Sequence, residues 1–438
     1  MLAPENVMKT LKRFMLVDGF DVVIDFEKSS GSRIVDARSG KSFLDMFTMV
    51  ASHPLGMNHP RLMEASMREH LGRMAVNKPS NSDIYSAELA EFVHNFATHA
   101  APSWMKHLFF VSGGALAVEN SIKVAFDWKV RKNMSRGVSG EVGSRVLHFR
   151  ECFHGRSGYT LSMTDTDPSK TMYFPKFDWP RIENPKMAFP CTGDALEAVQ
   201  QAEERALGQI MAAIAENGDD IAALILEPIQ GEGGDNHFRP EFFRALRKIC
   251  DEHAIFFILD EVQTGMGMTG RWWAHEHAGV EPDAIAFGKK TQVCGIAVGP
   301  RVDEVPDNCF AKPSRINSTW GGNLVDMVRC SRFIDVIRED NLMENAAARG
   351  RQALARLGEL QAGRPGAMGN IRGQGLLVAF DLADPSHRPS LLSRAFENGL
   401  LILPAGTSSL RLRPALNVSE AEIDEAVAII GKSLDQVM

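Results

Sequence analysis

The sequence predicts an α/β fold of two domains, in which a mainly parallel sheet flanked by helices is joined to a smaller α+β domain. Three observations lead to this prediction. The chain has 438 residues, enough for a large core and more than one domain. Its middle alternates short apolar runs with helical segments, as a buried parallel sheet does. Both ends instead contain short strands separated by turns.

The first part of the chain predicts a small β-meander. Three short strands are expected over residues 21–26, 32–37 and 42–47, separated by Gly31 and Gly40. From about residue 60, buried strands alternate with helices. The expected strands are residues 107–111, 145–149, 221–226, 255–259 and 284–287. One intervening helix, over about residues 196–213, has apolar side chains at spacings of three and four.

The last part of the chain returns to short strands. They are expected at residues 376–380, 400–403 and 410–412, with loops rich in Gly, Pro and polar residues at 361–369 and 383–389. Ser419 and Glu422 have the spacing of a capping box, which predicts a final helix. The predicted domains are therefore a large α/β domain over residues 60–325 and a smaller domain from residues 1–59 and 326–438.

Composition excludes several classes of protein. The net charge of −7 argues against a nucleic-acid-binding surface, which normally needs a basic stripe. No apolar run is long enough to span a bilayer, and the N-terminus does not resemble a signal peptide. None of the six cysteines forms a Cys-x-x-Cys pair, which predicts free thiols and a cytoplasmic protein without a cysteine metal site.

Two neighbouring strands of the predicted sheet end in ionisable side chains. The strand at 255–259 runs into Asp260 and Glu261, and the strand at 284–287 is followed by Lys289 and Lys290. Either pair alone is ordinary for a loop or a solvated surface. In an open α/β sheet, however, ligands bind at the carboxyl ends of strands. A lysine buried against a ligand there can act as a nucleophile or base.

Two loops upstream add groups that suit an anionic ligand. Gly114 and Ala115 follow a strand and precede a helix over about residues 117–132, where backbone N–H groups can bind phosphate. The segment lacks the full dinucleotide-binding spacing. Phe153 can cover a planar ring and Arg156 can hold a carboxylate, whereas His154 alone suggests a structural histidine. The His-Glu-His run at 275–277 predicts a solvated helix surface rather than a metal site.

Six segments together resemble the class III aminotransferases. They stand in the order typical of that family: Gly-Gly-Ala at 113–115, Phe-His-Gly-Arg at 153–156, Glu-Pro-Ile-Gln-Gly-Glu-Gly-Gly at 227–234, Asp-Glu-Val-Gln at 260–263, Gly-Lys at 288–289 and Asn-Ser-Thr at 317–319. The resemblance extends from about Met15 to the last helix. It implies the fold-type I arrangement of pyridoxal-phosphate-dependent transferases, with the smaller α+β domain built from both chain ends. It also implies a homodimer with active sites at the subunit interface.

The resemblance implies a role for each matching residue. Lys289 would hold pyridoxal 5′-phosphate covalently and move a proton between substrate and cofactor, and Asp260 would keep the pyridine nitrogen protonated. The other implied cofactor-binding residues are Gly114 and Ala115 for the phosphate, Phe153 and Val262 for the ring faces, Gln263 for the phenolic oxygen, and Thr319 for the phosphate of the neighbouring subunit. The implied substrate-binding residues are Arg156, Glu232, Gln263, Asn317 and Arg411.

Two assignments depend on residues with close rivals. Counting forward from Asp283 selects Lys289, while counting back from the next glycine selects Lys290; the forward count crosses a single strand, so we predict Lys289. Arg411 matches the family's arginine for the carboxylate beside the reacting carbon, and Glu232 the carboxylate that masks it. Alternate residues of a strand share a face, so Arg413 remains an alternative to Arg411.

Within the class, residues 77–83, 174–181, 287–295 and 313–323 resemble the L-lysine 6-aminotransferases. That resemblance implies transfer of the ε-amino group of L-lysine to 2-oxoglutarate, in lysine catabolism or in the supply of an antibiotic precursor. The 4-aminobutyrate aminotransferases share some of these segments, so 4-aminobutyrate or ornithine remains an alternative donor. An aminomutase or racemase on the same cofactor, or a non-enzymatic binding protein, are the further hypotheses.

Overall fold

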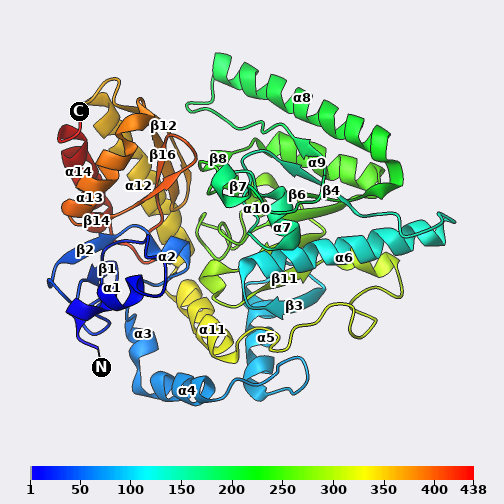
Figure 1. Cartoon of the computed structure of the whole chain (residues 1–438), viewed down its shortest axis with the longest axis horizontal. Coiled ribbons are helices and arrows are strands. Elements are labelled where there is room, and N and C mark those ends of the chain that lie inside the picture. The colour runs from blue at the N-terminus through cyan, green and yellow to red at the C-terminus, as the bar shows by residue number, and fades with distance from the viewer. Residues whose placement is uncertain (1) are drawn as a thin grey trace.

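A seven-stranded sheet lies at the centre of the larger part of the molecule (Figure 1). The computed structural model describes residues 2–438. The strand order is β3-β11-β10-β9-β6-β4-β5. The strands are β3 (His107–Val111), β4 (Arg145–Phe149), β5 (Arg181–Ile182), β6 (Ile221–Leu226), β9 (Phe256–Asp260), β10 (Ala284–Phe287) and β11 (Cys294–Val298). Within this sheet only β11 is antiparallel to its neighbours, so the carboxyl ends of the other strands meet at one edge.

The strands form because apolar side chains cover both faces of the sheet. Every residue of β6 and β9 is buried. On β9, Phe256 packs against Trp128 of α6 (Gly114–Ser135), with ring centroids 5.5 Å apart. The next residue, Phe257, belongs to the core on the opposite face, together with Phe242 of α9 (Pro240–Glu252). This alternation is what a sheet between two helical layers requires.

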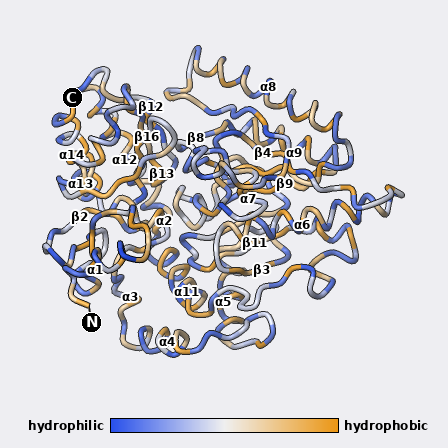
Figure 2. The backbone as a smooth tube through the Cα atoms, in the orientation of Figure 1, coloured by the Kyte–Doolittle hydropathy of each residue, from blue (hydrophilic) through white to orange (hydrophobic). Residues whose placement is uncertain are grey.

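Most of the predicted central elements are confirmed. The five expected strands are present, with β9 shifted by one residue, while β11 was not predicted. The expected helix at 196–213 is α8 (Asp194–Asn217), in which Val199, Ala206 and Ile210 are buried. Figure 2 shows hydrophilic and hydrophobic residues interleaved along it. Among the residues that the structure describes, no helix has the length and apolar character needed to cross a membrane.

Two further sheets lie beside the central one (Figure 1). A four-stranded antiparallel sheet has the order β12-β13-β16-β15, and a three-stranded sheet the order β1-β2-β14. The strands are β12 (Met368–Gln374), β13 (Leu377–Leu382), β15 (Leu403–Ala405), β16 (Ser409–Leu412), β1 (Arg33–Val35), β2 (Ser42–Asp45) and β14 (Leu400–Leu401). Because β14 pairs in parallel with β2, the two ends of the chain meet in one sheet. The smaller part is therefore α+β, as predicted.

The ends of the chain also correct some predictions. Residues 21–26 do not form a strand; they make one isolated bridge, between Ile24 and Asp36. The expected strand at 400–403 is interrupted, so β14 and β15 belong to different sheets. The predicted capping box is confirmed: the backbone N–H of Ser419 donates to Glu422 at 2.8 Å and begins α14 (Glu420–Asp435).

Helices complete the fold around these sheets. The α-helices not yet named are α1 (Pro4–Lys12), α2 (Thr48–Ala51), α3 (Pro60–Met63), α4 (Ala65–Val76), α5 (Ala87–His99), α7 (Gly158–Met163), α10 (His275–Ala278), α11 (Leu324–Glu339), α12 (Leu342–Ala362) and α13 (Arg388–Glu397). Short 3₁₀ helices are η1 (Pro168–Lys170), η2 (Gly218–Asp220), η3 (Lys289–Thr291), η4 (Pro300–Glu304) and η5 (Pro385–His387). A two-stranded ribbon, β7 (Ile229–Gln230) with β8 (Asn236–His237), encloses the turn at residues 231–235.

Candidate active site

Asp260 is the last residue of β9 and lies at the carboxyl edge of the central sheet. It is paired in register with Ala286 of β10, so Lys289 follows on the neighbouring strand, as predicted. One carboxylate oxygen accepts the backbone N–H of Val262 at 3.1 Å. The other lies 2.8 Å from Nδ1 of the buried His154. A buried carboxylate with these two donors is held in one orientation.

His154 is the side chain that supports Asp260. Burial alone lowers the pKa of the imidazole, but the neighbouring Cys152 and the hydrogen bond to Asp260 raise that pKa well above its usual value. The imidazole and the Asp260 carboxylate lie 2.8 Å apart, and two opposite charges in contact stabilise each other. The sequence suggested only a structural histidine at this position; the contact with Asp260 is a positioning role that β9 and the 153–156 loop create together.

Glu227 connects two loops of the site. Its carboxyl group accepts the N–H of Phe153 at 2.8 Å and that of Gly231 at 3.2 Å. Burial raises the pKa of Glu227 to about 7, with the charge of His154 opposing the rise. This residue ties the Phe-His-Gly-Arg loop to the turn that contains Glu232, and sequence reasoning did not single it out.

The two adjacent lysines have different surroundings. Lys290 is 1% exposed, and its Nζ donates to the backbone oxygen of Gln263 at 2.6 Å. Lys289 is only partly buried, and within residues 2–438 its Nζ makes no hydrogen bond. Burial lowers the pKa of Lys289, and the charge of Asp260 partly restores it. Lys289 therefore has the amine available for a ligand, while Lys290 supports the Gln263 backbone.

Glycine packing brings the anion-binding loop to Asp260. Helix α6 begins at Gly114, and the N–H groups of its first turn have no carbonyl partner within the helix. A Cβ atom at Gly114 would lie 2.9 Å from Cγ1 of Val262. A Cβ atom at Gly155 would lie 2.5 Å from Cβ of Ala115. Only glycine allows these approaches, so the N-terminus of α6, Val262 and the Phe153 loop meet at one place.

Glu232 and Arg411 form an ion pair across the site. Oε2 of Glu232 lies 2.6 Å from Nη2 of Arg411 on β16, whose side chain is 4% exposed. The Nε and Nη1 atoms of Arg411 are buried and, within the described residues, unpartnered. Burial raises the pKa of Glu232, but Arg411 and Lys170 outweigh that effect and lower it to about 2. Glu232 is thus an ionised carboxylate over an arginine that retains free donors.

Arg413 is the buried rival of Arg411 and has other partners. It forms an ion pair with Asp235, and its Nε donates to Oε1 of Gln263 at 3.1 Å. Because arginine can only donate, Oε1 of Gln263 is engaged and its amide N–H₂ group is left to donate. The geometry therefore places Arg411, and not Arg413, opposite Glu232.

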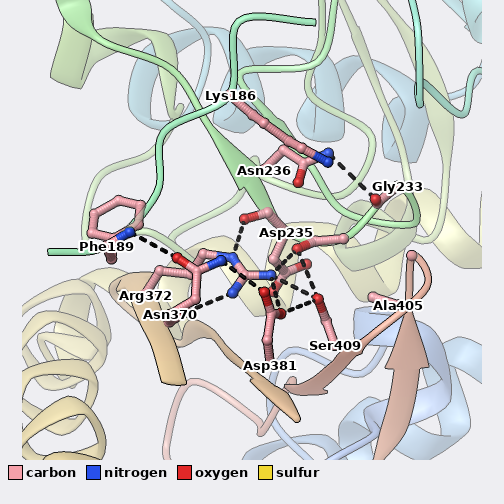
Figure 3. Close-up of polar contacts among 12 residues, drawn as sticks. Lys186, Phe189, Gly233, Asp235, Asn236, Asn370, Arg372, Asp381, Ala405 and Ser409 are labelled. Atoms are coloured by element: carbon pink, nitrogen blue, oxygen red, sulfur yellow. Dashed lines mark hydrogen bonds and ion pairs between the residues drawn. The ribbon is translucent and has the colours of Figure 1, made fainter. Parts of the chain in front are cut away.

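A buried polar cluster holds the Glu232 turn against the smaller sheet (Figure 3). Nε of Arg372 donates to the backbone oxygen of Asp235 at 3.0 Å. Its Nη2 donates to Asp381 at 2.9 Å and to Ser409 at 2.7 Å. Ser409 begins β16, the strand with Arg411, so this cluster sets the position of Glu232 relative to Arg411. Sequence reasoning missed it, because the burial of Arg372 depends on the pairing of β12 with β13.

Three predicted site residues are exposed in the single chain. Arg156 is exposed and, among the residues described, makes no ion pair or hydrogen bond through its side chain. Asn317 and Thr319 are also exposed, in a segment fastened by Ser82 through a 2.5 Å hydrogen bond to the backbone oxygen of Ser318. Among the residues described, none of these three forms a hydrogen bond or ion pair with Asp260 or Lys289.

The prediction for residues 275–277 was wrong. His275 is buried, not solvated, and its Nδ1 lies 3.0 Å from Glu261. Nε2 of His277 lies 3.1 Å from Oγ1 of Thr269. The short helix α10 packs close to the end of β9, and the second carboxylate of the Asp-Glu pair turns away from the site to hold it. The six cysteines are free thiols, as expected.

Residues 16–434 match the family described as aminotransferase class-III. The L-lysine-epsilon aminotransferase of Mycobacterium tuberculosis (strain H37Rv) is 52% identical over 99% of this chain and 96% of its own length. A probable mitochondrial 4-aminobutyrate aminotransferase of Caenorhabditis elegans is 34% identical over 94% of this chain and 87% of its own. The structure of the M. tuberculosis lysine aminotransferase in its internal aldimine form superposes with a TM-score of 0.97, at 51% identity, over the whole of both chains.

Proposed function

Because the chain belongs to the class III aminotransferases, we propose that it uses pyridoxal 5′-phosphate to transfer the ε-amino group of L-lysine to 2-oxoglutarate. The products would be L-glutamate and 2-amino-6-oxohexanoate, which cyclises to a piperideine carboxylate. The observation that supports this proposal most is the Glu232–Arg411 ion pair, since it suits a site that accepts an amine chain and a dicarboxylate in turn. The names of the similar M. tuberculosis proteins favour lysine as the donor.

The residues present fit this cofactor. The unpaired amine of Lys289 suits the aldehyde, and the buried carboxyl group of Asp260, held by His154, suits a protonated pyridine nitrogen. The first-turn N–H groups of α6 suit a phosphate. The free amide N–H₂ of Gln263 suits the phenolic oxygen, because Arg413 engages the other end of that amide. When bound, the cofactor supplies an electron sink for the electrons that remain on carbon after a proton leaves.

The residues that would hold the cofactor are those of the described loops. Asp260 would pair with the ring nitrogen and Gln263 with the phenolic oxygen, while Phe153 and Val262 would cover the ring faces. Gly114 and Ala115 would bind the phosphate through their N–H groups, and Thr319 would reach the phosphate in a second copy. Lys289 would hold and return a proton at Nζ; its lowered pKa makes the neutral amine accessible for this task.

Glu232 and Arg411 would allow one site to serve two unlike substrates. With L-lysine bound, methylene groups face Arg411, and Glu232 keeps the buried guanidinium paired. With 2-oxoglutarate or glutamate bound, the carboxylate beside the reacting carbon takes Arg411 through its unpartnered Nε and Nη1 atoms. Arg156 would hold the far carboxylate of either substrate, and Asn317 would contact the substrate. The exposure of Arg156, Asn317 and Thr319 supports a homodimer whose interface completes the site. The enzyme would act in the cytoplasm, as expected from its unpaired cysteines.

A steady-state assay with L-lysine and 2-oxoglutarate tests this function. Glutamate and the cyclised piperideine should both form, in equal amounts. The Glu232–Arg411 ion pair is equally compatible with other ω-amine donors, so the turnover of 4-aminobutyrate and of ornithine is measured in the same assay as that of lysine. Equal or faster turnover of either would replace lysine as the donor, and amine conversion without any keto acid would indicate a mutase or racemase.

A further inference from the structure

Lys170 is a second cation at the site, and no prediction or assigned role involves it. It is the last residue of η1, in the loop that follows α7. Its Nζ lies 2.7 Å from Oε1 of Glu232 and 3.1 Å from Oγ1 of Thr166. The same Nζ lies 5.4 Å above the centroid of the Phe153 ring. Its side chain is 15% exposed, so this amine is held in place rather than solvated.

Glu232 therefore divides its two oxygens between two cations. Oε2 faces Arg411 and Oε1 faces Lys170. The cations come from different parts of the fold, since Arg411 is on β16 of the smaller sheet and Lys170 is on a loop beyond the central sheet. A carboxylate that leaves Arg411 by rotating about its own side-chain bonds remains within reach of Lys170.

We propose that Lys170 is a specificity-determining residue that keeps Glu232 paired when a substrate carboxylate displaces it from Arg411. This inference rests on the proposed function, because it concerns the same pair of substrates. With an amine substrate, Glu232 contacts both cations. With 2-oxoglutarate, Arg411 binds the substrate and Lys170 is the cation that remains. The position of Lys170 thus favours the state of the site that accepts a dicarboxylate.

The physical reason is the cost of an unpaired charge in a partly buried place. The side chain of Glu232 is 30% exposed, so water alone solvates it incompletely. Without Lys170, Glu232 is still paired with Arg411 in the amine-binding state. In the dicarboxylate-binding state, Glu232 would then have no cation beside it. The two states are affected unequally, and binding of 2-oxoglutarate should weaken more than binding of the amine.

The test compares Lys170→Met with Lys170→Arg in the holoenzyme. Methionine retains an apolar chain over Phe153 but removes the charge, and arginine restores a cation. The dissociation constant of 2-oxoglutarate is measured by calorimetry without any amine donor, and KM and kcat are measured for both substrates. We expect Lys170→Met to weaken 2-oxoglutarate binding by about three- to tenfold, the range for one charged hydrogen bond at a partly exposed site.

The KM for the amine and kcat should change by less than about twofold, a limit within the scatter of such mutants, and Lys170→Arg should recover most of the lost affinity. Unchanged affinity for 2-oxoglutarate, or equal losses for both substrates, would overturn the proposal. The calorimetric measurement needs no amine, so a donor other than lysine would refute the proposed function without affecting this result.

A double-mutant cycle separates action through Glu232 from direct contact with substrate. In the Glu232→Gln background there is no displaced carboxylate, so the further change Lys170→Met should leave the dissociation constant of 2-oxoglutarate unaltered. The same loss of affinity in both backgrounds would mean that Lys170 contacts the substrate itself, and would overturn the proposal.

Discussion

Replacement of Glu232 by glutamine should penalise the amine substrate selectively. The Arg411 side chain is 4% exposed, and two of its three nitrogens already lack a partner within the described residues. Glutamine keeps the shape and one hydrogen bond but removes the charge. With the methylenes of the amine beside it, the guanidinium would then be a buried cation without a counter-ion.

The magnitude follows from the burial of the pair. Removing one partner of a fully buried ion pair costs about 3–5 kcal/mol. Glu232 is 30% exposed and glutamine still accepts a hydrogen bond, so we expect about 2 kcal/mol. That corresponds to about a 30-fold fall in kcat/KM for L-lysine. With 2-oxoglutarate, the substrate itself neutralises Arg411, so its kcat/KM should be unchanged or higher.

Separate half-reactions distinguish these outcomes. Each is followed in single turnover by the change in cofactor absorbance, with L-lysine added to the pyridoxal form of the enzyme or 2-oxoglutarate added to the pyridoxamine form. Glu204→Gln, an exposed change on α8, is the matched control and should behave like the parent. The reasoning fails if the lysine half-reaction keeps its rate, or if both half-reactions slow to the same extent.

Three other predictions follow from the same geometry. Lys289→Ala should abolish transfer and the visible absorbance of bound cofactor, whereas Lys290→Met should retain that absorbance and chiefly lower the thermal midpoint; the reverse pattern would contradict the assignment. Gly155→Ala should destabilise the fold by about 2–4 kcal/mol, measured by denaturant unfolding, because the new Cβ meets Ala115 and the φ angle is +126°. The pKa of Glu232 is lowered to about 2, so its ion pairs stabilise the fold above the unfolded pKa near 4.5, and this contribution disappears as the pH falls toward 2. The thermal midpoint of Glu232→Gln should therefore fall less steeply than that of the parent over this range; parallel curves would argue against it.

The fold was predictable wherever burial is periodic along the chain. A strand covered on both faces must be apolar throughout, so β6 and β9 are visible in the sequence as continuous runs. The segment at 21–26 also contains an apolar run, but none of its residues is fully buried, and it makes one bridge instead of a strand. Strand β11 was missed because Gly295 interrupts a short run. A Cβ atom at Gly295 would lie 2.5 Å from the backbone oxygen of Phe109 on the neighbouring strand β3, which accounts for the glycine.

The candidate site was predictable only in part. Asp260 and Lys289 follow neighbouring parallel strands, and strand order in an α/β sheet brings such positions together. His275 shows the limit of the same reasoning: helix periodicity assigned it to solvent, but Glu261 turns toward it and buries it. The positioning residues Glu227 and Arg372 carried no signal of their own, since each acts through backbone groups far away in the chain.

By itself the sequence determined the fold class, the placing of Asp260 and Lys289 at the carboxyl ends of neighbouring strands, and the family, because these depend on local apolar patterning and on segments in a set order. Only the tertiary structure decided which of two adjacent lysines has an unpaired amine, and that Arg411 rather than Arg413 faces Glu232. It alone showed Lys170 beside that carboxylate. These outcomes depend on charges from distant segments that fold into contact, where burial makes each unpaired group costly and so selects one arrangement.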